Sequence, residues 1–198
     1  SGELTGVFSS TLADVDAVLV VAPETNGILL RMTELAEEQK APVLLGSSSS
    51  ALKRVSNKEK AVEIARSVGV AVPRSIATSA DEEEEAIHRL AQDIGYPIVL
   101  KPNDGAGCDG VLVANGRQDL SRALKIARRE RPKERLLLQE YVKGTDASVS
   151  IISSRDGRAM PLSLNRQMID LRSPDDEPST YRGGHTPLHH PLERESFD

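Results

Sequence analysis

The sequence has few of the residues that mark several common protein classes. Its 198 residues include one cysteine, no tryptophan and only 3% aromatic residues, and its net charge is −5. The single cysteine, Cys108, cannot form an internal disulfide, so a reducing cytoplasm is the expected compartment. Few rings for stacking bases and no basic excess argue against a nucleic-acid partner. The longest apolar run, Ala17–Ala22, is far shorter than the roughly 18 residues that span a bilayer, which excludes a membrane-spanning protein.

The residues that are present follow an α/β pattern. Short apolar runs alternate with segments of helical periodicity, in a chain of 38% hydrophobic and 28% charged residues. Strands are predicted over Asp16–Ala22 and Pro42–Leu45, with a helix over Gly27–Glu38 between them. This segment looks like the end of a small βαβ layer, and Gly46–Ser50 follows it as a hinge of small residues.

Two Ser–Glu pairs have the spacing of a capping box, Ser56 with Glu59 and Ser79 with Glu82. Each pair is expected to open a helix. The acidic run Asp81–Glu85 then lies in the first turn of the second helix, where carboxylates favour the positive end of the helix dipole. We interpret this run as a solvated helix start rather than a metal site.

A third helix and several strands complete the predicted pattern. The helix covers Gln118–Arg129, and the strands cover Arg74–Ala77, Pro97–Lys101, Val111–Ala114, Leu136–Tyr141, Ala147–Ser153 and Ala159–Asn165.

The last segment, Leu171–Asp198, is polar and rich in proline and glycine, with no clear element. His185, His189 and His190 have a spacing that could bind a metal on a helix. Two prolines among them argue against a regular helix, so a solvated loop is the preferred interpretation.

Two lysines stand at the ends of predicted elements. Lys58 follows Asn57 at a helix start, where an ordinary surface lysine is the simpler interpretation. Lys101 ends a buried apolar strand and is followed by Pro102, so its ammonium is held on a rigid element, as a phosphate ligand would be. A lysine at the edge of the core fits that position equally well.

Three glycines in six residues mark the loop Asn103–Gly110. They permit positive φ and close approach of backbone N–H groups to phosphates. The loop is not a Walker or dinucleotide motif, because a strand follows it. It fits a flexible phosphate-covering flap or a plain hairpin turn. A nucleophilic role for Cys108 is disfavoured, since the adjacent aspartate would raise its pKa.

The segment Leu138–Asp146 is a strand that ends in polar residues, followed by a glycine turn and a carboxylate. Its backbone could meet a base and Asp146 could meet a ribose hydroxyl, although any edge strand can have this appearance.

The order of these four features resembles the ATP-grasp ligase family, over roughly Pro42–Ser153. The resemblance implies an α/β (α+β) ATP-grasp fold. Residues 1–52 would be the end of an N-terminal α/β domain and residues 53–198 the ATP-grasp domain. Within it, residues 53–140 would form the small subdomain and residues 141–198 the start of the large subdomain.

The resemblance also implies a site for ATP with Mg²⁺. The nucleotide-binding residues that it implies are Lys58, Lys101, Gly105, Ala106, Gly107, Gly110, Gln139, Glu140, Tyr141, Val142 and Asp146. Arg166 is the catalytic candidate, because it could meet a substrate carboxylate bidentately. An ordinary surface arginine is an equally good interpretation.

The implied reaction joins a small-molecule carboxylate to an amine through an acylphosphate, chiefly by positioning and charge neutralisation. Segments Ala22–Leu29, Leu44–Ser49, Pro161–Gln167 and Gly183-Gly184 look like the branch that contains archaeal tyramine–glutamate ligase. An amino acid such as glutamate is then the expected acid. A homodimer is one option for the assembly.

One departure concerns the metal. The family places magnesium-binding carboxylates and an asparagine near the end of the domain, in a pattern like Glu-x-Asn-Pro-Arg. The acidic residues in and just before the tail do not match this pattern, and we assign none of them as a metal ligand. They are Asp170, Asp175, Asp176 and Glu177. We expect a C-terminally incomplete fragment, inactive by itself, rather than a degenerate relative. Two alternatives stay open: a nucleotide-binding regulatory module without turnover, and an interaction domain with no nucleotide site.

Overall fold

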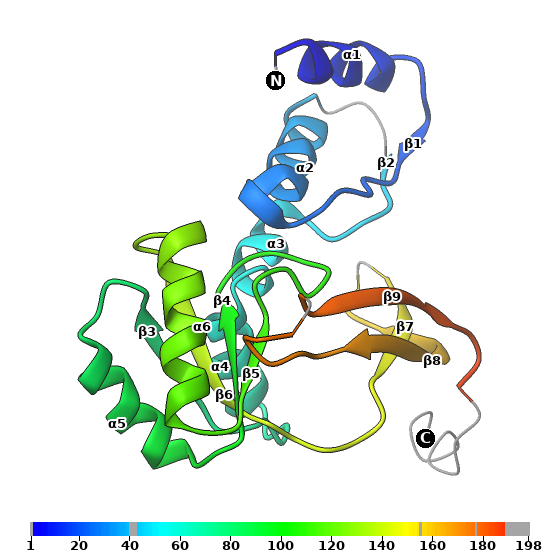
Figure 1. Ribbon diagram of the computed structural model, residues 1–198. Helices are drawn as coiled ribbons and strands as arrows, with labels where there is room; N and C mark the ends of the chain where they lie inside the picture. Colours follow the sequence, from blue (N-terminus) through cyan, green and yellow to red (C-terminus); the bar gives the residue numbers. More distant parts are fainter. Residues whose placement is uncertain (1, 40–42, 155, 177, 189–198) are drawn as a thin grey trace.

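The structure, a computed structural model, describes residues 2–39, 43–154, 156–176 and 178–188. Three sheets organise it, with two, four and three strands (Figure 1). An N-terminal part surrounds the two-stranded sheet, a central part packs two helices on the four-stranded sheet, and the three-stranded sheet lies beside it. The mixed α/β architecture predicted from the sequence is therefore confirmed.

The N-terminal part contains more helix and less strand than predicted. Its strands are two residues long and pair in parallel. The apolar run after the first strand finds no cover, since Leu19 and Val21 are 60% and 88% exposed. The predicted hinge Gly46–Ser50 instead enters a helix, because the Ser48 hydroxyl caps it by accepting from the Ala51 N–H at 3.3 Å. The elements are α1 (Gly2–Leu12), β1 (Ala17–Val18), the 3₁₀ turn η1 (Thr25–Gly27), α2 (Ile28–Glu38), β2 (Val43–Leu44) and α3 (Ser49–Val55).

The central part is an antiparallel sheet in the order β3-β6-β4-β5, with two helices packed against one face. Each of these helices buries one apolar face, as at Ile87, Ala91 and Leu124. They pack on Leu100 and Leu138, which are 1% and 0% exposed. The elements are α4 (Lys58–Ser67), β3 (Ser75–Ser79), α5 (Glu84–Ile94), β4 (Ile98–Pro102), β5 (Leu112–Ala114), α6 (Arg117–Glu130) and β6 (Arg135–Glu140).

Both predicted capping boxes are wrong. Ser56 ends α3, and the cap of α4 is Asn57, whose Oδ1 accepts from the Lys60 N–H at 2.9 Å. Ser79 remains in β3 because it pairs with Arg135 of β6. As a result α5 begins only at Glu84, and only the last two residues of the acidic run lie in its first turn.

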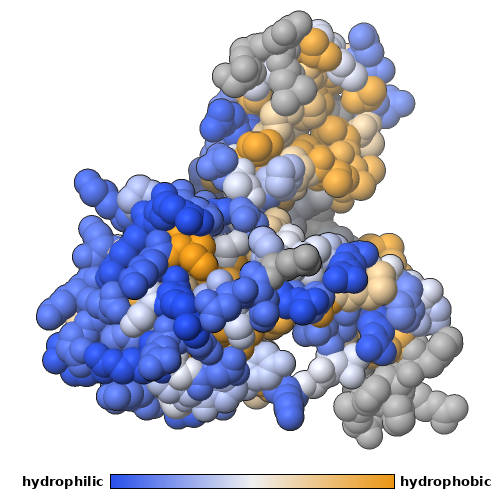
Figure 2. Space-filling model, viewed as in Figure 1, coloured by the Kyte–Doolittle hydropathy of each residue, from blue (hydrophilic) through white to orange (hydrophobic). Residues whose placement is uncertain are grey.

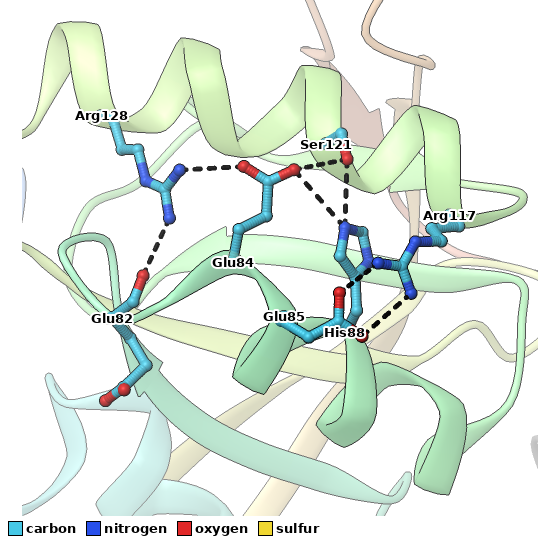
Figure 3. Close-up of polar contacts among 7 residues, drawn as sticks. All are labelled: Glu82, Glu84, Glu85, His88, Arg117, Ser121 and Arg128. Carbon is cyan, nitrogen blue, oxygen red and sulfur yellow. Dashed lines mark hydrogen bonds and ion pairs between the residues drawn. The ribbon is translucent and has the colours of Figure 1, made fainter.

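A polar network joins α5 to α6 (Figure 3). Glu84 accepts from the Ser121 hydroxyl at 2.6 Å and from Arg128 at 3.1 Å. The buried His88 places Nε2 at 3.0 Å from the Ser121 hydroxyl and 3.5 Å from Glu84. Because both groups face the same ring nitrogen, the imidazole does not link carboxylate to hydroxyl as it does in a catalytic triad. The network holds the helical layer together.

The third sheet has the order β7-β8-β9 and is antiparallel. Its strands are β7 (Ala147–Ser153), β8 (Ala159–Asp170) and β9 (Thr180–His185). The prediction of no element after Leu171 is wrong, because β9 pairs with the second half of β8 and extends that strand beyond Asn165. Gly184 permits this approach, since a Cβ there would lie 2.7 Å from the Arg166 carbonyl oxygen.

The predicted histidine cluster is only partly visible. His185 ends β9, whereas His189 and His190 lie outside the described residues. Within the described ranges no group of three His, Cys, Asp or Glu side chains is arranged to hold a metal.

The hydropathy of the surface differs between the parts. Figure 2 shows apolar side chains gathered over the N-terminal part, while the surface over α5 and α6 is mostly hydrophilic. The exposed apolar residues of the N-terminal part include Val7, Leu19, Val21 and Leu45. Among the described residues, no helix has the length and apolar character to cross a membrane.

Candidate functional site

A cavity of about 600 Å³ lies against the face of the central sheet opposite α5 and α6. Side chains alternate along a strand, so Val99 and Lys101 of β4 line the cavity while Ile98 and Leu100 enter the core. Ten of the twelve predicted site residues line it: Lys58, Lys101, Gly105, Ala106, Gly107, Gln139, Glu140, Tyr141, Val142 and Asp146. The structure does not place Gly110 or Arg166 on its wall.

Two ammonium groups enter this cavity from different elements. Lys58 Nζ donates to the Gly105 carbonyl at 3.0 Å, and Lys101 Nζ donates to Gln139 Oε1 at 2.6 Å. In the part of the chain that the structure describes, neither lysine forms an ion pair. Two partly buried cations whose direct partners are neutral oxygens make a site suited to an anion of more than one charge.

The surroundings shift the pKa of both lysines. Burial, followed by the positive charge of Lys58, lowers the pKa of Lys101 to about 8. Burial also lowers the pKa of Lys58, while the carboxylates of Glu24, Asp104 and Glu134 act in the opposite direction. These carboxylates lie too far away to form ion pairs with Lys58. A bound polyanion would supply the missing counter-charge.

Asn103 fixes the position of Lys58. It is only 8% exposed. Its backbone oxygen accepts from the Lys58 N–H at 3.1 Å, its Oδ1 accepts from the Glu59 N–H at 3.0 Å, and its own N–H donates to the Arg135 oxygen at 2.9 Å. The helix N-terminus, the loop start and β6 therefore meet at one residue, through its backbone and its side chain. Sequence reasoning assigned Asn103 no such role, although a polar residue directly after a buried strand was a signal.

The glycine-rich loop has the backbone that its sequence predicts. Gly105, Gly107 and Gly110 have φ of 102°, 68° and 71°. Gly105 and Gly107 line the cavity, but Gly110 meets the protein instead, because a Cβ there would lie 2.8 Å from Pro102 Cγ. The structure therefore shows a packing requirement at Gly110, and its role as a nucleotide contact stays a prediction.

Cys108 also lines the cavity, with φ of 68°. Burial raises the pKa of its thiol, and the charge of Asp146 adds to this effect. The direction agrees with the prediction against a nucleophile. The cause differs from the predicted effect of the adjacent aspartate.

A chain of hydrogen bonds orients the side chain of Gln139. The Ser75 hydroxyl donates to the Pro73 oxygen at 2.9 Å and accepts from Gln139 Nε2 at 2.8 Å, which turns the amide oxygen toward Lys101. Next along β6, the Glu140 carboxylate accepts from the Arg74 N–H and Nε, both at 3.2 Å. These bonds lower the pKa of Glu140. The backbone N–H of Glu140 is engaged as well, since it donates to the Arg74 oxygen at 2.8 Å.

Arg166 lies on β8 and lines a smaller neighbouring cavity of about 310 Å³. The two cavities share Gly144, Asp146, Ile169 and Asp170. Asp170 is engaged by two arginines, in a close contact with Arg172 and at 3.0 Å from Arg182.

Apolar residues that sequence reasoning missed complete the main cavity. They are Pro73, Val99, Val111, Ile169 and Leu171. The last two belong to the end of β8 and the segment after it, where the sequence predicted no element. An apolar wall beside two cations and flexible glycine backbone suits a ligand with a flat apolar part and a polyanionic part, as a nucleotide has.

Comparisons with known proteins agree with this chemistry. The model of the ATP-grasp domain matches residues 55–198, and that of the pre ATP-grasp 3 domain matches residues 1–52. The chain belongs to the ATP-grasp family. Biotin carboxylase 1 of Bacillus subtilis is 30% identical over 106 residues, 52% of this chain and 23% of that protein. The carbamoyl phosphate synthase large chain of Pyrococcus furiosus is 30% identical over 115 residues, 58% of this chain and 10% of that protein.

Solved structures share the fold, which confirms the predicted ATP-grasp fold. The VanG D-Ala:D-Ser ligase of Enterococcus faecalis superposes with a TM-score of 0.72 at 17% identity, over 92% of this chain and 53% of that chain. N5-carboxyaminoimidazole synthetase of Staphylococcus aureus superposes with a TM-score of 0.66 at 13% identity, over 97% of this chain and 46% of that chain. The chain thus spans about half the length of these structures and under a quarter of the two sequence relatives.

The lowered pKa of Lys101 predicts a pH effect on stability. Between pH 8 and 10.5 the unfolded chain keeps a proton that the folded chain has released, so the free energy of unfolding rises with pH in this window. Lys101→Met removes the effect. In urea denaturation above about pH 8, the free energy of unfolding of the wild type should rise relative to that of Lys101→Met. The rise should be at most about 1.4 kcal/mol per pH unit. A constant difference between the two proteins across that range would contradict the lowered pKa.

Proposed function

We propose that the cavity binds ATP. The observation that carries the proposal is the meeting of Lys58 and Lys101 in one partly buried cavity, beside a glycine-rich loop and without a carboxylate partner among the described residues. The triphosphate would supply the negative charge that these lysines lack. Family membership supports ATP as the anion, because the matching model is that of the ATP-grasp domain.

Each wall of the cavity has a role in this proposal. Lys58 and Lys101 hold the phosphates, and backbone N–H groups of residues 105–107 cover them. The backbone of residues 139–142 faces the base, which lies against the apolar wall. Asp146 accepts from a ribose hydroxyl. Residues 1–52 and 53–198 are proposed as separate domains, with the small and large subdomains meeting near residue 140.

We further propose that the protein is an ATP-dependent carboxylate–amine ligase. The γ-phosphoryl group passes to a carboxylate oxygen, ADP leaves, and an amine displaces phosphate from the resulting acylphosphate. Lys58, Lys101 and the loop neutralise and orient the transferred group. The loop also excludes water, which would hydrolyse the acylphosphate. Mg²⁺, when bound, would neutralise further phosphate charge. The described residues provide no ligand set for it, so no step is assigned to the ion.

The proposed acid is an amino acid such as glutamate, as in the branch that contains tyramine–glutamate ligase. The basis is the likeness of Ala22–Leu29, Leu44–Ser49 and Pro161–Gln167. Arg166 is proposed to meet the substrate carboxylate from the smaller cavity, which shares four residues with the main one. In the described ranges its guanidinium makes no hydrogen bond or ion pair, so it is available to a ligand.

A second candidate function is nucleotide binding without turnover. The observation that favours it is the lack of a metal-ligand cluster in the described part of the chain. It predicts the same nucleotide site but no acylphosphate.

Thermal unfolding tests nucleotide binding. ATP at about 100 times its dissociation constant should add about 2.7 kcal/mol of stability, a rise in Tm of roughly 5–10 °C for a chain of this size. Lys58→Ala and Lys101→Ala should each remove most of the rise. Lys60→Ala changes an exposed lysine of the same helix turn and should retain it. Equal shifts in all four proteins would contradict the assigned phosphate contacts.

Hydroxylamine trapping separates the ligase from the binding module. With ATP, Mg²⁺, glutamate and hydroxylamine, a protein that contains this chain and forms an acylphosphate yields a hydroxamate and ADP in equal amounts. Arg166→Gln should raise the KM for the acid at least about tenfold, because a bidentate ion pair is lost. ATP binding without hydroxamate from any amino acid would favour the binding module.

A further inference from the structure

One arginine lies behind the glycine-rich loop, on the side away from the main cavity. Arg131 directly follows α6, and its side chain is only 22% exposed. Its guanidinium forms a close ion pair with Asp109 and lies 3.8 Å from Asp104 and 3.4 Å from Glu134. Asp104 and Asp109 stand near opposite ends of the loop. A single side chain therefore faces both ends.

The glycines of the loop bring its backbone against this guanidinium. A Cβ at Gly105 would lie 3.9 Å from Arg131 Nη1, and a Cβ at Gly110 would lie 3.9 Å from Arg131 Nε. Both ends of the loop thus pack on the same planar group. The packing complements the ion pairs, which by themselves would be weak in water.

The inner side of the loop is held by another cation. Lys58 Nζ donates to the Gly105 carbonyl at 3.0 Å and lines the main cavity, whereas Arg131 does not line it. Arg131 instead lines a second cavity of about 680 Å³ together with Asn103, Asp104, Asp109 and Glu134. The loop is therefore fixed from both sides, and of the two cations that hold it only Lys58 lines the main cavity.

We propose that Arg131 is a positioning residue that keeps the glycine-rich loop closed over the phosphates of the nucleotide. The inference rests on the proposed function. Arg131 acts through the loop and contacts neither the base nor the ribose. Its loss should therefore weaken binding in proportion to the phosphates that the loop covers, while a nucleoside monophosphate is affected little.

A lysine cannot replace this arginine. Asp104, Asp109 and Glu134 approach from different directions, and Nη1 and Nη2 of one rigid planar group address them. An ammonium is a single point charge and cannot cover two loop ends at once.

Titration calorimetry with ATP and with AMP tests the proposal. Arg131→Gln and Arg131→Lys should each weaken ATP binding about tenfold and AMP binding less than about twofold. Asp109→Asn should reproduce part of the loss of ATP affinity. Combined with Arg131→Gln it should weaken ATP binding little further, because the two residues form one contact. Arg129→Gln is the matched control, since that side chain is 75% exposed and pairs only with its neighbour Glu130 in the described structure.

Hydrogen exchange in the free protein measures the loop directly. The Asp109 and Val111 amides donate to the Ala106 and Cys108 oxygens within the loop. Both amides should exchange faster in Arg131→Gln, and at the wild-type rate in Arg129→Gln.

Several outcomes would overturn the inference. Equal losses of ATP and AMP affinity would show a general structural effect, and unchanged ATP affinity would show that the contact is dispensable. If the wild type binds neither nucleotide, the proposed function fails. The exchange rates then still decide whether Arg131 holds the loop, and unchanged rates would contradict that as well.

Discussion

Two ammonium groups in one partly buried cavity are the constraint on which the site depends. Lys58 and Lys101 repel each other, and burial lowers the pKa of both. Their hydrogen-bond partners, the Gly105 carbonyl and the Gln139 amide oxygen, are neutral. The free protein therefore carries an electrostatic cost at this site, and a polyanion removes it. This arrangement is unfavourable for the fold alone, and it is the basis on which we propose that the site binds a triphosphate.

The two lysines are held in different ways, Lys101 by a strand of the sheet and Lys58 by contacts with the glycine-rich loop. Lys101 lies on β4, between β5 and β6, and the opposite face of that sheet carries the buried hydrophobic core under α5 and α6. Lys58 lies at a helix start that is tied to the loop through Asn103. The loop itself is held by side chains rather than by a ladder of strand hydrogen bonds. The position of the loop is therefore set by these side-chain contacts and not by the sheet.

Local patterns predicted the parts of the structure that depend on local physics. Helical periodicity located α5 and α6, and Lys-Pro at the end of an apolar strand located Lys101. The features that depend on contacts between distant segments were not predicted from the sequence. Ser79 stays in a strand because of Arg135, and β9 exists because β8 accepts it as a partner. Position 110 requires a glycine because any Cβ there would lie too close to the Pro102 ring, and the spacing of residues in the sequence does not reveal this contact.

The most direct test of the central claim is an NMR titration with a non-hydrolysable ATP analogue. Shifts of the Gly105, Gly107 and Val142 amides, together with the Lys58 and Lys101 ammonium signals, would place the ligand in the cavity between the loop and β6. The account predicts saturable changes at these positions, with little change at the α5–α6 network around His88. Changes confined to other surfaces, or none at all, would contradict it.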